Sequence, residues 1–191
     1  MLSNGEFERR YLNVVDVEAT CWEGKPPRGQ VSEIIEIGLC VVDFTLRRRV
    51  AKHSVIVRPA RSKVSGFCTE LTGHTQETVD VGIPFADACR ILTDVHDSRT
   101  RPWASWGDYD RRQFERQCAA EGTPYPFHPD HTNAKKVFAE ANGLPRGVGM
   151  ARALTMSDLP LDGRHHSGAD DAWNIAALIL RLIHVGHWPS P

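Results

Sequence analysis

Two acidic residues close an apolar run near the start of the chain, in the segment Val14-Val15-Asp16-Val17-Glu18-Ala19-Thr20. Side chains two residues apart point to the same face of a strand, so a strand here places Asp16 and Glu18 side by side. The intervening valines turn into the opposite layer. Two adjacent carboxylates repel each other unless a cation holds them. A divalent ion that prefers oxygen ligands, such as Mg²⁺ or Mn²⁺, is the natural partner, and the plain alternative is an Asp and a Glu that flank a turn.

The 191-residue chain is 41% hydrophobic, which suffices for one well-cored domain, and we expect a single domain over residues 1–191. No apolar run reaches the length of a membrane helix, and no signal-peptide pattern opens the chain. Five cysteines without a CxxC pair suit a reducing compartment, so we expect a cytoplasmic protein. The formal net charge of −1 excludes a globally basic nucleic-acid binder, but metal ions and a local basic rim can still supply positive potential.

Apolar periodicity and turn residues predict an α/β fold with a mixed sheet. Strands over 11–17, 33–44 and 50–58 are expected to form an antiparallel meander, with a loop over 20–30. The run Arg47-Arg48-Arg49 is interpreted as a solvated hairpin turn. Later elements are predicted as short helical turns within 59–82, a helix beginning at Pro84, a strand over 103–106, a loop over 122–131 that leads into a short strand, and helices over 109–121, 133–141, 148–155 and 169–184.

Two aspartates compete for a role at the predicted strand-to-helix junction Trp106-Gly107-Asp108-Tyr109-Asp110. Such junctions at strand ends usually carry the chemistry of α/β sheets. Asp108 directly precedes the helix, where its side chain can cap free N–H groups. Asp110 lies one turn before Phe114 and shares the core-facing side of the helix. We therefore predict that Asp110 is a metal ligand and that Asp108 is a cap.

The same choice arises at the start of the last helix, in the segment His165-His166-Ser167-Gly168-Ala169-Asp170-Asp171. Asp171 shares its side of the helix with three apolar residues and faces inward, whereas Asp170 falls on a predicted solvent face. An inward carboxylate needs a partner, and a metal ion is the simplest one. His166 can approach the same metal as a proton acceptor. His165 is the alternative proton acceptor. The simpler interpretation of each histidine is a loop residue that takes no part in chemistry.

These residues resemble the three motifs of the DEDDh 3′–5′ exonuclease superfamily, which includes RNase T and the proofreading subunit of DNA polymerase III. The motifs are Asp16-x-Glu18, Asp110 after a strand end, and His166 with Asp171 after four intervening residues. The chain is more similar to the Eri-type branch, through four blocks in order: Asp16-Val-Glu-Ala-Thr-Cys, Glu33-Ile-Ile-Glu-Ile-Gly, Phe67-Cys-Thr-Glu-Leu-Thr-Gly and His166-Ser-Gly-Ala-Asp-Asp-Ala-Trp-Asn-Ile-Ala. The resemblance covers residues 11–184.

The resemblance implies an RNase H-like fold, a mixed five-stranded sheet flanked by helices, with a site for two Mg²⁺ or Mn²⁺ ions. The implied metal ligands are Asp16, Glu18, Asp110 and Asp171, and the implied general base is His166. The implied substrate contacts are backbone amides at Ala19 and Thr20 for the terminal sugar, a wedge at Leu71 and Gly73 for the last base, and Tyr109 as a stacking ring whose alternative role is core packing.

The resemblance further implies 3′–5′ exonucleolytic hydrolysis of single-stranded nucleic acid, with RNA as the favoured substrate and 5′-nucleoside monophosphates as products. We expect no membrane partner, and no room for the extra nucleic-acid-binding domain that some animal relatives carry. A catalytically silent nucleic-acid- or nucleotide-binding module on the same fold is the alternative, although binding alone would not need all four carboxylates and His166. An RNase H-type endonuclease is a third reading, which the block Leu71-Thr72-Gly73 disfavours through family resemblance.

Overall fold

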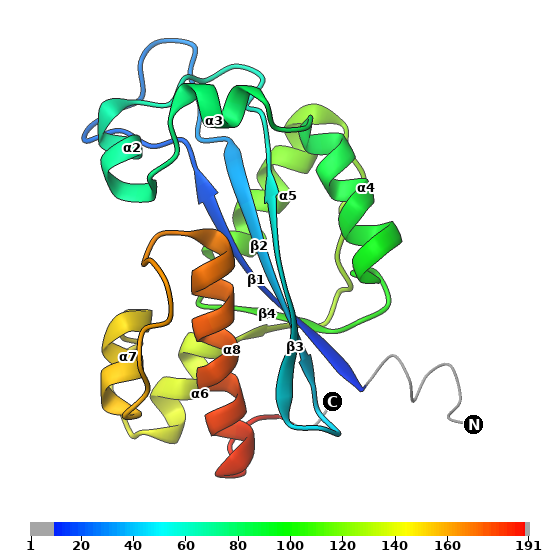
Figure 1. Cartoon of the computed structure of the whole chain (residues 1–191), viewed down its shortest axis with the longest axis vertical. Coiled ribbons are helices and arrows are strands. Elements are labelled where there is room, and N and C mark those ends of the chain that lie inside the picture. Colours follow the sequence, from blue (N-terminus) through cyan, green and yellow to red (C-terminus); the bar gives the residue numbers. More distant parts are fainter. Residues whose placement is uncertain (1–9, 190–191) are drawn as a thin grey trace.

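The computed structural model describes residues 10–189 as a central twisted sheet with helices on both faces and at one end (Figure 1). The strands are β1 (Tyr11–Ala19), β2 (Ile34–Asp43), β3 (Arg48–Ile56), β4 (Trp103–Ser105) and β5 (His131–Asn133). The helices are α2 (Gly66–Thr72), α3 (Gln76–Asp80), α4 (Phe85–His96), α5 (Tyr109–Glu121), α6 (Ala134–Ala141), α7 (Met150–Met156) and α8 (Gly168–His184).

The five strands lie in the order β3-β2-β1-β4-β5. The first three form an antiparallel meander, and β4 and β5 add to β1 in parallel, so the predicted mixed five-stranded sheet is confirmed. Parallel strands end at the same edge of a sheet, and in α/β folds that edge is where ligands usually bind. The carboxyl ends of β1 and β4 therefore mark the place where a site is expected.

Side chains of β1 alternate between two cores. Val15 and Val17 pack with Phe114 beneath α4 and α5, whereas Leu12 and Val14 pack on the other face against α6, α7 and α8 (Figure 1). Asp16 and Glu18 share the second face, so the predicted opposition of valines and carboxylates is confirmed. The carboxylates consequently point toward the layer that contains the start of α8.

A bulge shapes the end of β2 that faces this site. Glu18 pairs with Glu36 and Ala19 pairs with Ile34, which leaves Ile35 as the extra residue of β2. Ile35 packs with Cys68 and Val79 in a small third core beneath α2 and α3. Bulges of this kind redirect side chains near sites, and here the bulge anchors the two short helices above the ends of the central strands.

Two predicted strand boundaries are wrong. β1 extends two residues beyond the predicted end, so Glu18 and Ala19 belong to the strand. β3 begins at Arg48, which places Arg48 and Arg49 in the strand rather than in the turn. The interpretation of Arg49 as solvated is also wrong, because its guanidinium lies 4.1 Å from the centre of the Trp173 ring and donates to the Trp173 carbonyl at 3.1 Å.

All five cysteines are free thiols, and four of them are buried. Within residues 10–189, no helix has the length and apolar character needed to cross a membrane.

The start of α8 crosses β2 at a glycine pair. A Cβ placed on Gly38 would overlap the backbone of Gly168, and a Cβ on Gly168 would meet the backbone nitrogen of Gly38 at 3.0 Å. Neither neighbour is a flexible side chain that could move away. The pair therefore sets how closely the first turn of α8 can approach the central strands.

The substitution Gly38→Ala should lower the free energy of unfolding by at least about 2 kcal/mol, because the added methyl group can be accommodated only by displacing α8. Urea unfolding measures the change. Gly24→Ala is the matched control, since nothing lies within 4 Å of the corresponding Cβ, and it should be close to neutral. Equal stabilities of the two variants would contradict this account of the contact.

Candidate active site

Three carboxylates converge at the carboxyl end of β1. Asp16 and Glu18 come from the strand itself, and Asp171 comes from the first turn of α8. One oxygen from each carboxylate lies within 4.8 Å of the others. An all-oxygen donor set at this spacing is the kind that a hard divalent cation prefers.

Asp110 joins the cluster from the first turn of α5. It is 4% exposed, and its Oδ1 accepts a hydrogen bond from the Val17 N–H at 3.0 Å. β4 pairs with β1 only as far as Val14, so the Val17 N–H lies beyond that ladder and Asp110 satisfies it instead. The same bond orients Asp110 toward the carboxylates of β1.

These groups line one cavity of about 360 Å³. Its walls come from β1, α2, α5, α7, α8 and the loop before α8. The lining residues are Asp16, Val17, Glu18, Ala19, Cys21, Leu71, Trp106, Tyr109, Asp110, Gly149, Met150, His165, His166, Asp171 and Ile175.

Burial raises the pKa values of all four carboxyl groups, and repulsion by neighbouring acids adds to the rise for Asp16, Glu18 and Asp110. For Glu18, burial acts first and the charge of Asp171 second, and the pKa reaches about 8. Burial raises the pKa of Asp110 to about 6. Burial and then the Asp110 charge raise the pKa of Asp16 well above its usual range, and burial raises that of Asp171 although His165 opposes the shift. Carboxylates in such surroundings ionise readily only when a cation is present, so the donor set fits divalent metal ions.

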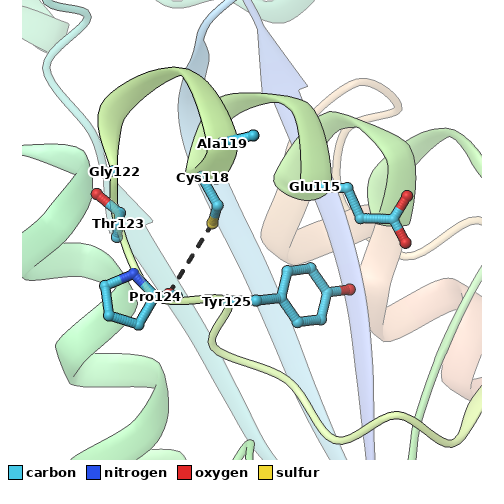
Figure 2. Close-up of a pocket in the computed structure, with 7 residues that line it drawn as sticks. All are labelled: Glu115, Cys118, Ala119, Gly122, Thr123, Pro124 and Tyr125. Carbon is cyan, nitrogen blue, oxygen red and sulfur yellow. Dashed lines mark hydrogen bonds between the residues drawn. The ribbon is translucent and has the colours of Figure 1, made fainter.

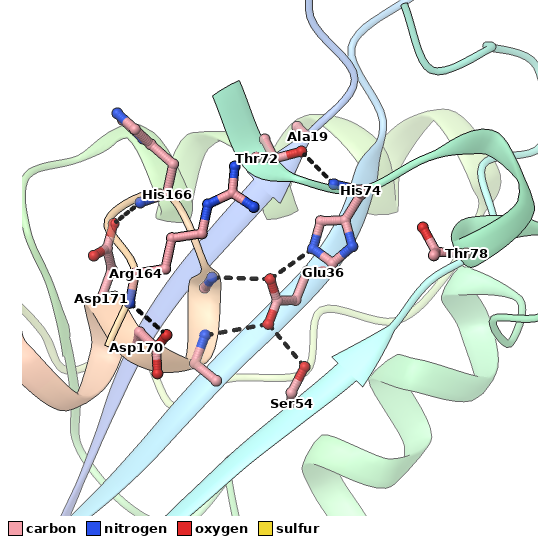
Figure 3. Close-up of polar contacts among 12 residues, drawn as sticks. Ala19, Glu36, Ser54, Thr72, His74, Thr78, Arg164, His166, Asp170 and Asp171 are labelled. Carbon is pink, nitrogen blue, oxygen red and sulfur yellow. Dashed lines mark hydrogen bonds and ion pairs between the residues drawn. The ribbon is translucent and has the colours of Figure 1, made fainter. Parts of the chain in front are cut away.

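Two adjacent histidines on the loop before α8 line the same cavity. His165 Nδ1 lies 2.9 Å from Asp171 Oδ2, and the His166 backbone N–H donates to that oxygen at 3.0 Å. The two rings stack with centroids 4.0 Å apart. One ring nitrogen of each histidine and one Asp171 oxygen lie within 4.8 Å of one another. Figure 3 shows that the hydrogen bond to Asp171 comes from the His166 backbone and not from its ring. Among the described residues, the His166 ring has no hydrogen-bond partner. Burial and the neighbouring His165 lower the pKa of His166, so the ring is neutral and able to accept a proton near pH 7.

Glu36 is a buried carboxylate beside the site that the sequence analysis did not single out as functional. It accepts hydrogen bonds from the backbone N–H groups of Gly168 at 2.9 Å and Ala169 at 3.3 Å, and from the side chains of Ser54 and His74 at 2.8 Å each (Figure 3). Burial alone would raise the pKa of Glu36, but the bonds from His74, Ser54 and Gly168 lower it to about 2. The signal in the sequence was a glutamate inside an otherwise apolar strand.

Two of the expected substrate contacts are engaged elsewhere in the structure, and their role toward substrate stays a prediction. The Thr20 N–H already donates to the Glu33 carbonyl at 2.8 Å, and the hydroxyl of the fully buried Thr20 donates to the Val31 carbonyl, so both donor groups of Thr20 are engaged within the chain. Gly73 does not line the cavity. It ends α2 with a left-handed φ of 81°, and its N–H donates to the Thr69 carbonyl at 2.8 Å.

The other expected contacts line the cavity. Ala19 is buried at the end of β1, Leu71 lies at the end of α2, and Tyr109 is 54% exposed on α5. Core packing alone therefore does not explain the position of the Tyr109 side chain, which is half exposed in the cavity wall.

The two aspartates set aside as non-ligands differ from expectation in detail. Asp108 occupies the N-cap position of α5 but makes no capping bond; it accepts from Asn133 Nδ2 at 3.1 Å instead. Asp170 is 21% exposed and pairs with Lys52 and with the Arg164 N–H, so its predicted solvent face is wrong. Neither side chain lines the cavity.

A larger hollow of about 560 Å³ lies elsewhere, at the C-terminal end of α5 (Figure 2). Glu115, Cys118 and Tyr125 are among its lining residues, and the Cys118 thiol lies 4.0 Å from the Pro124 carbonyl. The four converging carboxylates and both cavity histidines are absent from its walls, so we assign no chemistry to it.

A mixed sheet that gathers carboxylates beyond parallel strand ends offers a site where divalent metal ions can support hydrolytic chemistry. The family model described as an exonuclease, RNase T, matches residues 14–179. The chain therefore belongs to the RNase T exonuclease family, and the expected assignment to an exonuclease enzyme is confirmed at this level.

Individual relatives agree with the family. Human 3′-5′ exoribonuclease 1 is 31% identical over 186 residues, which are 92% of this chain and 53% of the relative. The 3′-5′ exonuclease Snipper of Drosophila melanogaster is 28% identical over 197 residues, 92% of this chain and 70% of the relative. The chain thus spans about half the length of the human relative.

Solved structures agree as well. The nuclease domain of 3′hExo, a DEDDh family member bound to rAMP, matches with a TM-score of 0.81 and 28% identity over 93% of both chains. A full-length 3′-exonuclease matches with a TM-score of 0.82 and 29% identity over 93% of this chain and 61% of the other. The RNase H-like fold and the resemblance to DEDDh enzymes of the Eri type are confirmed.

In the absence of metal, the free energy of unfolding should fall as the pH rises from 4.5 to about 8. The native chain keeps a proton on Glu18 up to a pKa of about 8, whereas the unfolded chain releases it near the usual value of 4.5, so rising pH favours unfolding in this window. Urea unfolding in EDTA at pH 5 and pH 8 measures the change. The Glu18 contribution, about 2–5 kcal/mol, should disappear in Glu18→Gln.

Glu140→Gln on α6 is the matched control, because this exposed carboxylate lies outside the cavity and its substitution should leave the pH trend unchanged. Saturating Mn²⁺ should reverse the trend, since metal ions bind the deprotonated carboxylates. A Glu18→Gln protein with the pH dependence of the unsubstituted chain would contradict the prediction.

Proposed function

We propose that this chain is a metal-dependent 3′–5′ exonuclease that hydrolyses single-stranded RNA and releases 5′-nucleoside monophosphates. The observation that best supports the proposal is the convergence of Asp16, Glu18, Asp110 and Asp171 on one cavity beyond the ends of β1 and β4. A binding module without chemistry would not need four carboxyl groups whose pKa values are raised by burial.

The four carboxylates would hold two divalent ions, Mg²⁺ or Mn²⁺. When bound, such a pair lowers the pKa of a water molecule and stabilises charge on the attacking and leaving oxygens of an in-line displacement. The chain contributes fixed ligand positions. Asp110 is tied to the backbone of β1, and Asp171 is held by His165 and the His166 N–H.

His166 would accept the proton of the attacking water. Its ring lines the cavity, has no partner among the described residues and has a lowered pKa, all of which suit a general base near neutral pH. His165 would act as a positioning residue, because its Nδ1 is engaged with Asp171. The His166 backbone is left-handed, with φ at 62°, and its N–H donates to Asp171 while its ring makes no hydrogen bond to a described residue.

The terminal nucleotide would occupy the cavity. Its volume of about 360 Å³ lies at the small end of ligand pockets, which suits one nucleotide better than a continuous strand. Leu71 and Tyr109 offer apolar and aromatic surface to the last base, and Ala19 lies where the terminal sugar would sit. A site that accepts one residue at a chain end favours exonucleolytic over internal cleavage.

The relatives favour RNA as the substrate. Several are named exoribonucleases, one related structure holds rAMP, and another concerns 3′-end recognition of a histone mRNA stem-loop. Discrimination between RNA and DNA depends on contacts to the 2′-hydroxyl. We therefore propose single-stranded RNA 3′ ends as the preferred substrate of this chain.

The purified chain with Mn²⁺ should release mononucleotides from the 3′ end of a 5′-labelled single-stranded RNA, and EDTA should stop the reaction. Asp16→Ala and Asp110→Asn should each lower kcat/KM at least about a hundredfold, because metal-ion stabilisation of the transition state contributes several kcal/mol. Gel analysis of the shortened 5′-labelled products, with chromatography of the released nucleotides, measures both outcomes. A matched DNA oligomer tests the substrate preference.

Asp108→Asn is the control for Asp110→Asn, because it makes the same chemical change two residues away and outside the cavity. It should retain most of the activity. Internal fragments would identify an endonuclease, RNA binding without any product would identify a silent module, and equal losses in the two variants would reject Asp110 as a ligand.

A further inference from the structure

Arg164 is an exposed residue on the loop between α7 and α8, two positions before His166. Its guanidinium reaches across to the C-terminal end of α2, where Nη2 lies 3.5 Å from the carbonyl oxygens of Glu70 and Leu71. Figure 3 shows the side chain extending between the Asp171 side of the site and the end of α2. Contacts at 3.5 Å are at the limit of hydrogen bonding, so they hold the group only weakly.

Two features of the fold determine where this guanidinium lies. The Arg164 backbone N–H donates to Asp170 Oδ2 at 2.8 Å, which fixes the Arg164 backbone against the first turn of α8. At the other end, a Cβ on Gly73 would overlap Arg164 Nη1. The glycine at the end of α2 therefore leaves the space that the guanidinium occupies.

The guanidinium of Arg164 has no acidic partner in the described part of the chain. Among residues 10–189, no carboxylate forms an ion pair with this side chain, although four carboxylates line the adjoining cavity. The guanidinium lies beside the site, because Leu71, whose carbonyl oxygen it contacts, is one of the residues that line the cavity. A guanidinium is a rigid fork that matches phosphate oxygens, and an anionic strand entering a carboxylate-lined cavity needs such a counter-charge at the mouth.

We propose that Arg164 binds a non-bridging phosphate oxygen of the RNA backbone at the mouth of the cavity and so holds the strand as its 3′ end enters. The inference rests on the proposed function and adds a specific strand-binding residue to it. The alternative is a purely structural contact in which Arg164 only links α2 to the loop that contains the two histidines.

Arg164→Ala should raise KM for a single-stranded RNA oligomer about tenfold or more with a smaller effect on kcat, because the contact holds the strand rather than the reacting atoms. The plot of log(kcat/KM) against log[salt] should become shallower by about 0.7, the value for one phosphate contact on a single strand. Arg164→Lys should recover part of the loss, since it keeps the charge but not the fork. Arg90→Ala, an exposed arginine on α4, is the control and should change neither quantity.

A neutral methylphosphonate placed in turn at each of the last three linkages identifies the phosphate. At one linkage, the neutral group should weaken RNA binding by the unsubstituted chain. The same group should cause no further loss of binding by Arg164→Ala. Fluorescence anisotropy with the same oligomers in the Asp16→Asn background tests the contact even if no turnover occurs, so its failure is distinct from failure of the nuclease proposal. Additive losses at every linkage, an unchanged salt slope, or a reduced melting temperature with unchanged KM would assign Arg164 a structural role and overturn the inference.

Discussion

Four carboxyl groups share one cavity, and their mutual repulsion is the constraint on which the rest of the site depends. Burial raises the pKa values of Asp16, Glu18, Asp110 and Asp171, and neighbouring acids raise the first three further, so the four groups do not all ionise without a counter-charge. A fold that keeps such a cluster sacrifices stability in the absence of metal, and we propose that binding of divalent cations offsets this cost. Function and instability therefore have the same physical origin here.

The scaffold opposes this repulsion with bonds that leave the carboxylates no freedom to separate. Asp110 is fixed by the Val17 N–H, and α8, which contains Asp171, is fixed at its first turn by Glu36. Glu36 is itself buried but well compensated, which is why its pKa is lowered to about 2 while that of Glu18, opposite it on β1, rises to about 8. Glu36 thus stabilises the fold, whereas Glu18 is available as a metal ligand. The glycine contact between β2 and α8 sets the spacing at which both can operate.

The sequence predicted the sheet, the opposition of valines and carboxylates on β1, and the four acids, because each follows from local periodicity and motif spacing. It failed where the outcome depends on partners distant in the chain. The Thr20 N–H is taken by Glu33 on a neighbouring segment, the Asp108 cap is replaced by a bond from Asn133, and Glu36 gains its role only when α8 packs over β2. The sequence did not indicate a role for Arg164 for the same reason, because that role depends on its contact with the end of α2, which is distant in the chain.

The most direct test of the central claim is a calorimetric titration of the metal-free chain with Mn²⁺ at pH 7, repeated in buffers of different ionisation enthalpy. Two ions should bind per chain with a net release of protons, because Glu18, with a pKa of about 8, holds its proton at this pH until a cation displaces it. Binding should weaken strongly in Asp16→Asn. Absence of binding, or heats that are independent of the buffer and unchanged in Asp16→Asn, would contradict the claim that repelling carboxylates form the metal site.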